Sequence, residues 1–146
     1  MLLRPKNQKY KKSQKGRLKS KSRPVANLEF GNFGLVSTKP FKITASHIES
    51  CRLGVRRIIK REGKVLFRVF PHIPVTKKPS EVRMGKGKGS VEYFMSRVPA
   101  NTVVLEIDYP GNPLIGLQAL KVASQILPVK TSILERFTPR IIRYDN

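Results

Sequence analysis

The segment at residues 83–90, which reads RMGKGKGS, has the residue types and spacing best suited to chemistry in this chain. Its alternating glycines remove every second side chain, so the backbone can approach a surface closely and present N–H groups to phosphate oxygens. Lys86 and Lys88 place positive charge between the glycines. The spacing departs from a nucleotide-binding loop and from the dinucleotide fingerprint, whose third glycine is replaced by Ser90. We predict a phosphate-binding segment without nucleotide hydrolysis; the alternative is a flexible connection that happens to contain lysine.

The N-terminal segment is the second strong signal, because the first 23 residues hold ten basic residues and no acidic one. Such a segment repels itself and buries too little apolar surface to fold alone, so we expect it to stay extended until a polyanion neutralises it. The whole chain shares this bias, with 30 Lys and Arg against 9 Asp and Glu and a net charge of +21. The predicted phosphate contacts of this segment are Arg4, Lys6, Lys9, Lys11, Lys12, Lys15, Arg17, Lys19, Lys21 and Arg23.

Groups typical of catalysis or metal binding are sparse. His47 and His72 are the only histidines, and neither has a cysteine or carboxylate at a metal-ligand spacing. Cys51 is the single cysteine, which excludes an intramolecular disulfide and a multi-cysteine zinc site. Neither Cys51 nor Ser90 has a histidine at a local motif spacing. We predict no catalytic residue, no metal ligand and no cofactor.

Carboxylates and aromatic side chains on the predicted strands have structural explanations. Glu106 and Asp108 share one strand face opposite the core, where an exposed pair that counters nearby lysines explains them better than general acid and base. Four aromatic side chains suit base stacking and core packing at least equally well: Phe67, Phe70, Tyr93 and Phe94.

A first helix is predicted from Thr44, a suitable N-cap, to Gly63. Its apolar residues fall on one face: Ile48, Cys51, Val55, Ile58 and Ile59. The outer face carries a basic stripe of Arg52, Arg56 and Lys60, flanked by Arg57 and Arg61. A solvated helix face normally mixes charges of both signs, so we expect this stripe to face the polyanion.

The remaining elements are predicted from apolar periodicity and turn residues. Residues 30–36 indicate a turn followed by a short strand, and residues 64–70 and 130–137 read as further strands. Residues 91–98 and 102–109 are predicted to form an antiparallel hairpin. Prolines at 71, 74 and 79 lead us to expect no regular structure between them. A second helix begins at Asn112 and Pro113, and its expected inward residues are Leu114, Leu117, Leu120, Ala123, Ile126 and Leu127.

Together these elements predict an α+β fold, in which two helices pack on one face of an antiparallel sheet. We expect a basic extension at 1–24, a single domain at 25–137 that carries the long Gly/Lys loop, and a C-terminal tail at 138–146. No run of about 20 apolar residues indicates a membrane span. Residues 1–90 hold 24 basic and 4 acidic residues, against 6 and 5 in residues 91–146, so one end of the molecule should meet the polyanion.

Several short blocks follow one another in an order typical of a single family. They are residues 1–2, 4–6, 9–10, 15–17, 30–35, 68–71, 74–79 and 81–89. With these blocks the chain resembles the bacterial-type large-subunit ribosomal protein sixteen from residue 1 to about residue 132. The most specific block is EVRMGKGKG at 81–89, which follows a Pro-x-Thr-x-Lys-Pro turn.

The resemblance implies a structural constituent of the large ribosomal subunit that is not an enzyme. Its implied partners are large-subunit ribosomal RNA, aminoacyl-site tRNA near the peptidyl-transferase centre, and neighbouring ribosomal proteins, without a membrane. The tail, the first helix and the lysines at 77 and 78 (Lys77, Lys78) are then expected to bind ribosomal RNA. The loop expected to face tRNA consists of Arg83, Met84, Gly85, Lys86, Gly87, Lys88 and Gly89.

The chain also departs from the family pattern. Residue 94 is Phe94 where tryptophan is common, residues 50–54 replace an alanine-rich stretch, and residues 138–146 extend past the usual end. The basic N-terminal segment lacks the apolar stripe of a cleavable presequence. We therefore expect a divergent member made inside an organelle, a mitochondrion, with a plastid or a bacterial cytoplasm as alternatives.

Two other classes of function remain open from the sequence. A free polybasic protein that binds an anionic membrane or RNA would explain the tail but not the glycine-spaced loop. A small enzyme that holds a phosphorylated substrate would explain the loop but leave the tail without a role. Sedimentation distinguishes these classes, because only a ribosomal protein should migrate with the large subunit in high salt.

Overall fold

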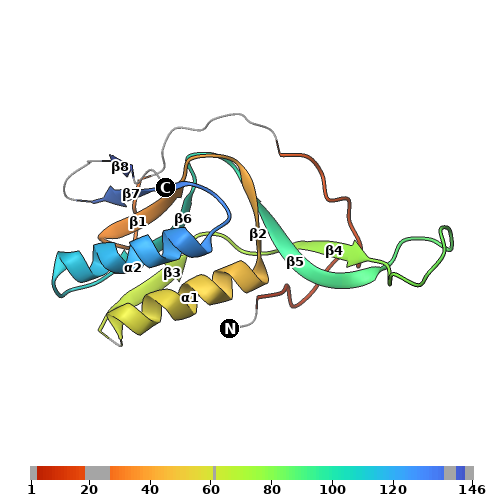
Figure 1. Ribbon diagram of the computed structural model, residues 1–146, viewed down its shortest axis with the longest axis horizontal. Helices are drawn as coiled ribbons and strands as arrows, with labels where there is room; N and C mark the ends of the chain where they lie inside the picture. The colour runs from red at the N-terminus through yellow and green to blue at the C-terminus, as the bar shows by residue number, and fades with distance from the viewer. Residues whose placement is uncertain (1–2, 19–26, 61, 137–140, 144–146) are drawn as a thin grey trace.

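The computed structural model describes residues 3–18, 27–60, 62–136 and 141–143, and these form two helices and two antiparallel sheets (Figure 1). The five-stranded sheet has the order β3 (Lys64–Phe67), β6 (Val103–Asp108), β1 (Phe33–Ser37), β7 (Thr131–Glu135) and β8 (Ile141–Arg143). The three-stranded sheet has the order β2 (Phe41–Thr44), β5 (Ser90–Val98) and β4 (Ile73–Lys77). The predicted α+β class is confirmed, with two sheets in place of the single sheet expected.

Helix α1 (Ala45–Ile59) begins at the predicted cap. The hydroxyl oxygen of Thr44 accepts the N–H of His47 at 3.3 Å, and the His47 ring accepts the N–H of Thr44 at 3.4 Å. The helix ends where Lys60 turns to a positive φ of 59°. Its buried residues are Ile48, Cys51, Val55 and Ile59, with Ile58 only partly buried, so the predicted inner face is confirmed.

Helix α2 (Pro113–Ile126) also starts as expected, with the Asn112 side chain accepting the N–H of Leu114 at 3.0 Å. Its buried face consists of Gly116, Ala119, Leu120 and Ala123. The expected burial of Leu114 is wrong, because its side chain is 69% exposed. At about 100° per residue, Leu114 lies roughly 200° from Gly116 and so points away from the buried face.

The main core lies between the two helices and one face of the five-stranded sheet. The sheet contributes Leu35, Leu105 and Ile133, which share a face because both partners are paired with Leu35. The opposite face is covered by the chain that leads into β1, where Leu28 packs against Val36 and Val103. Within the described part of the chain, neither helix is long and apolar enough to cross a membrane.

The predicted hairpin of residues 91–98 and 102–109 is wrong. Strand β5 pairs with β2 and β4, whereas β6 pairs with β1 and β3, so the two consecutive strands belong to different sheets. Their connection is bound to the end of β1, because the Ser37 carbonyl accepts the N–H of Asn101 at 2.7 Å and the Ser37 hydroxyl donates to Pro99 at 2.9 Å. Contacts to a distant strand therefore override the local turn signal.

The expectation of irregular structure between residues 71 and 79 is also wrong, because β4 forms there. Pro74 fits because β4 is at the edge of its sheet, where a missing N–H is tolerated. The strand expected at 64–70 ends at Phe67, and that expected at 130–137 covers Thr131–Glu135. The segment predicted as a C-terminal tail contains β8, which pairs with β7, and the rest of that tail lies outside the described residues.

Candidate nucleic-acid interface

The described part of the N-terminal tail, residues 3–18, has no helix or strand and lies along the three-stranded sheet (Figure 1). A groove between them is lined by tail residues such as Tyr10 and Ser13 and by sheet residues such as Ile73 and Arg97. All seven predicted cations in this part are exposed: Arg4, Lys6, Lys9, Lys11, Lys12, Lys15 and Arg17. The predicted contacts Lys19, Lys21 and Arg23 lie outside the described residues.

The Gly/Lys loop joins β4 to β5 at the far end of an arm that these two strands form (Figure 1). Every residue from 81 to 88 is exposed, and the Met84 side chain is completely exposed. Gly85 and Gly87 adopt positive φ values of 98° and 81°, with nothing within 4 Å of either position where a side chain would begin. At the base of the loop a Cβ on Gly89 would lie 2.4 Å from the backbone oxygen of Lys77, so only glycine fits there.

Lysines of the tail and the loop meet at this end of the arm. The Lys12 ammonium donates to the carbonyl oxygen of Lys88 at 2.7 Å. Lys77 is the last residue of β4, and Lys78 follows it at the start of the same connection. Lys77 also forms an exposed ion pair with Glu92 at 3.4 Å. The structure thus brings together the tail, the loop and the two lysines of the proline-rich turn, which are far apart in the sequence.

Helix α1, which carries the basic stripe, belongs to the body of the molecule and is separate from the arm (Figure 1). Arg56, Arg57 and Lys60 are exposed, as predicted, whereas Arg61 lies outside the described residues. Arg52 differs because its guanidinium is held by the Glu49 carboxylate, with one contact at 3.0 Å. This hydrogen bond lowers the pKa of Glu49, so the pair stays ionised and the Arg52 charge is partly neutralised.

Arg97 is an exposed cation beside the tail that sequence reasoning missed. Its guanidinium lies against Gly16, where an added Cβ would meet it at 2.3 Å. Gly16 has a positive φ of 64°, so glycine allows both the turn and the close approach. Position 97 carried no usable signal, because a single arginine on the polar side of a strand is typical of a solvated face.

Cys51 and the two histidines each lie within hydrogen-bonding distance of another group of the fold. The Cys51 thiol is buried and donates to the Ala123 carbonyl at 3.7 Å, and burial raises its pKa to about 11. The His47 ring takes part in the helix cap, and the His72 ring lies 3.1 Å from the Phe70 carbonyl. Among the described residues, no group of three or more His, Cys, Asp or Glu is placed to hold a metal ion.

The four aromatic side chains that suited either base stacking or core packing divide between the two. Phe70 and Tyr93 are exposed, while Phe67 and Phe94 are half-buried.

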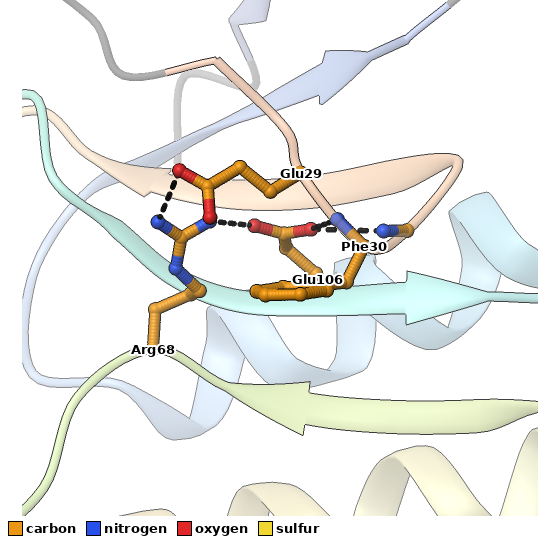
Figure 2. A network of polar contacts seen from close by, with 5 residues as sticks. Glu29, Phe30, Arg68 and Glu106 are labelled. Atoms are coloured by element: carbon orange, nitrogen blue, oxygen red, sulfur yellow. Dashed lines mark hydrogen bonds and ion pairs between the residues drawn. The ribbon is translucent and has the colours of Figure 1, made fainter.

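Glu106 is the largest departure from the predicted site, because its side chain is fully buried rather than exposed. Figure 2 shows its carboxylate under the chain that leads from the tail into β1. One oxygen accepts the N–H groups of Phe30 and Gly31, both at 2.8 Å, and the other accepts from Arg68. Arg68 also pairs with Glu29 at 3.1 Å and lies 5.5 Å from the Phe30 ring centroid.

This network keeps the buried carboxylate ionised. Burial alone would raise the pKa of Glu106, but the two N–H groups and the Arg68 guanidinium outweigh it and lower the pKa below its usual range. The network fixes the segment through which the tail joins the domain. The signal in the sequence was a glutamate flanked by apolar residues within a strand, which indicates a paired buried charge as readily as an exposed one.

Comparison with known proteins agrees with these features. The family model described as ribosomal protein L16p/L10e matches residues 5–134. The chain is 46% identical over 136 residues to the large ribosomal subunit protein uL16 of Erythrobacter litoralis, covering 93% of this chain and 94% of that protein. It is equally similar to the proteins of the same name from Orientia tsutsugamushi and Rickettsia felis, covering 93% of this chain and 99% of each relative.

These matches confirm the family resemblance drawn from the sequence blocks, and they include both the tail and the Gly/Lys loop. The chain therefore belongs to the ribosomal protein L16p/L10e family, whose members are components of the ribosome and not enzymes.

Proposed function

We propose that this protein is a structural constituent of the large ribosomal subunit, where it binds ribosomal RNA and contacts neighbouring ribosomal proteins. The observation that carries the proposal is that Lys12 of the tail meets the exposed cations of the β4–β5 loop at one end of the arm, beside the exposed Lys77 and the half-buried Lys78. RNA presents a dense array of phosphates, and neutralising them releases counterions, which stabilises the complex. The names of its bacterial relatives agree with a place in the large subunit.

The loop is proposed to help position aminoacyl-site tRNA near the peptidyl-transferase centre. It is the most projecting part of the described chain, and Arg83 and Lys86 lie exposed on it. The positive φ values of Gly85 and Gly87 turn the backbone without bulky side chains, so its N–H groups can approach a phosphate closely.

Deletion of residues 3–18 tests the RNA-binding part of this proposal. We expect the log–log salt dependence of binding to large-subunit ribosomal RNA to flatten by about 0.9 for each lost duplex contact, and by about 0.7 for each single-stranded one. A variant with the seven cations of this segment changed to glutamine should behave like the deletion, whereas a scrambled segment of the same composition keeps the charge. An unchanged slope in the glutamine variant would contradict a phosphate-binding role for the tail.

We also propose a mitochondrial ribosome as the location, with a plastid or a bacterial cytoplasm as alternatives. The divergence at residues 50–54 and 94 supports an organelle, while the bacterial relatives fit all three compartments. Purification of the particle that contains this protein, followed by sequencing of its ribosomal RNA, would decide among them. Cytoplasmic bacterial RNA in that particle would overturn the mitochondrial assignment.

A further inference from the structure

The tail and the Gly/Lys loop are joined by a reciprocal pair of hydrogen bonds. The Lys12 ammonium donates to the backbone oxygen of Lys88 at 2.7 Å, and the Lys88 ammonium donates to the backbone oxygen of Ser13 at 2.6 Å. The two segments are 75 and 76 residues apart in the sequence at these contacts. Two cations are thus directed at backbone carbonyls rather than outward.

The loop has little else to fix its position. Gly85 and Gly87 have nothing within 4 Å of a would-be Cβ, and glycine has the largest conformational freedom to lose on ordering. A third lysine supports the same arrangement from inside the loop, because the Lys78 ammonium donates to the Gly85 carbonyl. A loop ordered before it meets its ligand loses less entropy on binding.

The tail can act as the fixed partner because it is docked on the domain at several points. Leu3 packs against the main core, and the Ser13 hydroxyl oxygen is buried. Gly16 allows Arg97 to approach the tail backbone just beyond the two lysine contacts. The loop is therefore attached to a segment that is itself held by the body and the arm.

We propose that Lys12 and Lys88 are positioning residues, which latch the loop to the tail, and that Arg83 and Lys86 are the loop cations left to contact RNA. The assignment of Arg83 and Lys86 to RNA contact rests on the proposed function. The latch formed by Lys12 and Lys88 does not, because it is present in the protein without RNA. Lys12 and Lys88 would then position the loop, whereas Arg83 and Lys86 would contact RNA, although all four are basic residues in basic, polar stretches of the sequence.

The latch is tested by measuring the distance between spin labels on the tail and the loop. Labels at Gln14→Cys and Met84→Cys occupy exposed positions, and the buried, protonated Cys51 thiol does not compete for labelling. We expect a narrow distance distribution that broadens in Lys88→Met and in Lys12→Met. Lys86→Met removes the same charge from the same loop and should leave the distribution unchanged. A distribution as narrow in Lys88→Met as in Lys86→Met would overturn the latch.

RNA binding separates failure of the latch from failure of the proposed function. With a large-subunit ribosomal RNA transcript as probe, Lys86→Met should reduce the log–log salt slope by about 0.7–0.9, the value for one lost phosphate contact. Lys88→Met should weaken binding at every salt concentration with a smaller change in slope. If the distance distribution broadens in Lys88→Met while Lys86→Met and Lys88→Met both bind RNA like the wild type, the result would support the latch and contradict the RNA-binding role of the loop.

Discussion

Replacing Glu106 by glutamine is expected to lower the free energy of unfolding by about 3 kcal/mol. The buried carboxylate accepts two N–H groups on one oxygen and Arg68 on the other. A glutamine has only one acceptor oxygen, so in either orientation its NH2 group faces a donor. Arg68 remains 25% exposed, which places the effect at the lower end of the range for a broken buried pair. Urea denaturation of the two proteins measures the difference.

The matched control is Glu92→Gln, which breaks the exposed pair with Lys77 and should change stability by less than about 1 kcal/mol. The folded-state pKa of Glu106 is depressed, so its stabilising effect is present above the ordinary value of 4.5 and is lost as the pH falls through the lower folded value. The difference in the free energy of unfolding between the wild type and Glu106→Gln should therefore become smaller as the pH falls below about 4.5. Equal losses in Glu106→Gln and Glu92→Gln at neutral pH would show that the buried network contributes little.

Local signals predicted the two helices because their causes lie within a few residues. Thr44 and Asn112 mark the caps, and the apolar spacing of α1 identifies its buried face. Strand pairing depends on distant parts of the chain. The signals for a hairpin at residues 91–109 were consistent locally, yet Ser37 of β1 binds the connection and directs the two strands into different sheets.

Only part of the candidate interface was predicted, because its local features are visible in the sequence and its contacts between distant segments are not. Charge density and glycine spacing are visible along the sequence, so the tail and the loop were both identified. Their contact through Lys12 and Lys88 was not, because nothing local relates residues 75 positions apart. Glu106 was assigned to the correct strand face, but the chain at residues 28–31 that covers this face is a tertiary feature.

Replacing Arg83, Lys86 and Lys88 together by alanine should impair function while leaving the fold intact. All three side chains are exposed and none contributes to the core, so the free energy of unfolding should change by less than about 1 kcal/mol. A hydrogen bond to a charged group contributes about 1.5–3 kcal/mol, so even one lost contact to tRNA corresponds to roughly a tenfold weaker interaction. The measurement is aminoacyl-site tRNA binding and peptide synthesis by purified large subunits that contain the variant in full amount.

A charge-matched control keeps this result specific to the loop. Changing Lys39, Lys64 and Lys130 to alanine removes three exposed cations from other parts of the surface and should leave tRNA binding close to wild type. Because both triple variants lose the same net charge, a difference between them reflects where the cations lie rather than the overall field of the protein. Wild-type rates for the loop variant would reduce the loop to a connector between β4 and β5, and the proposed contacts with RNA would then depend on the tail and the exposed face of α1.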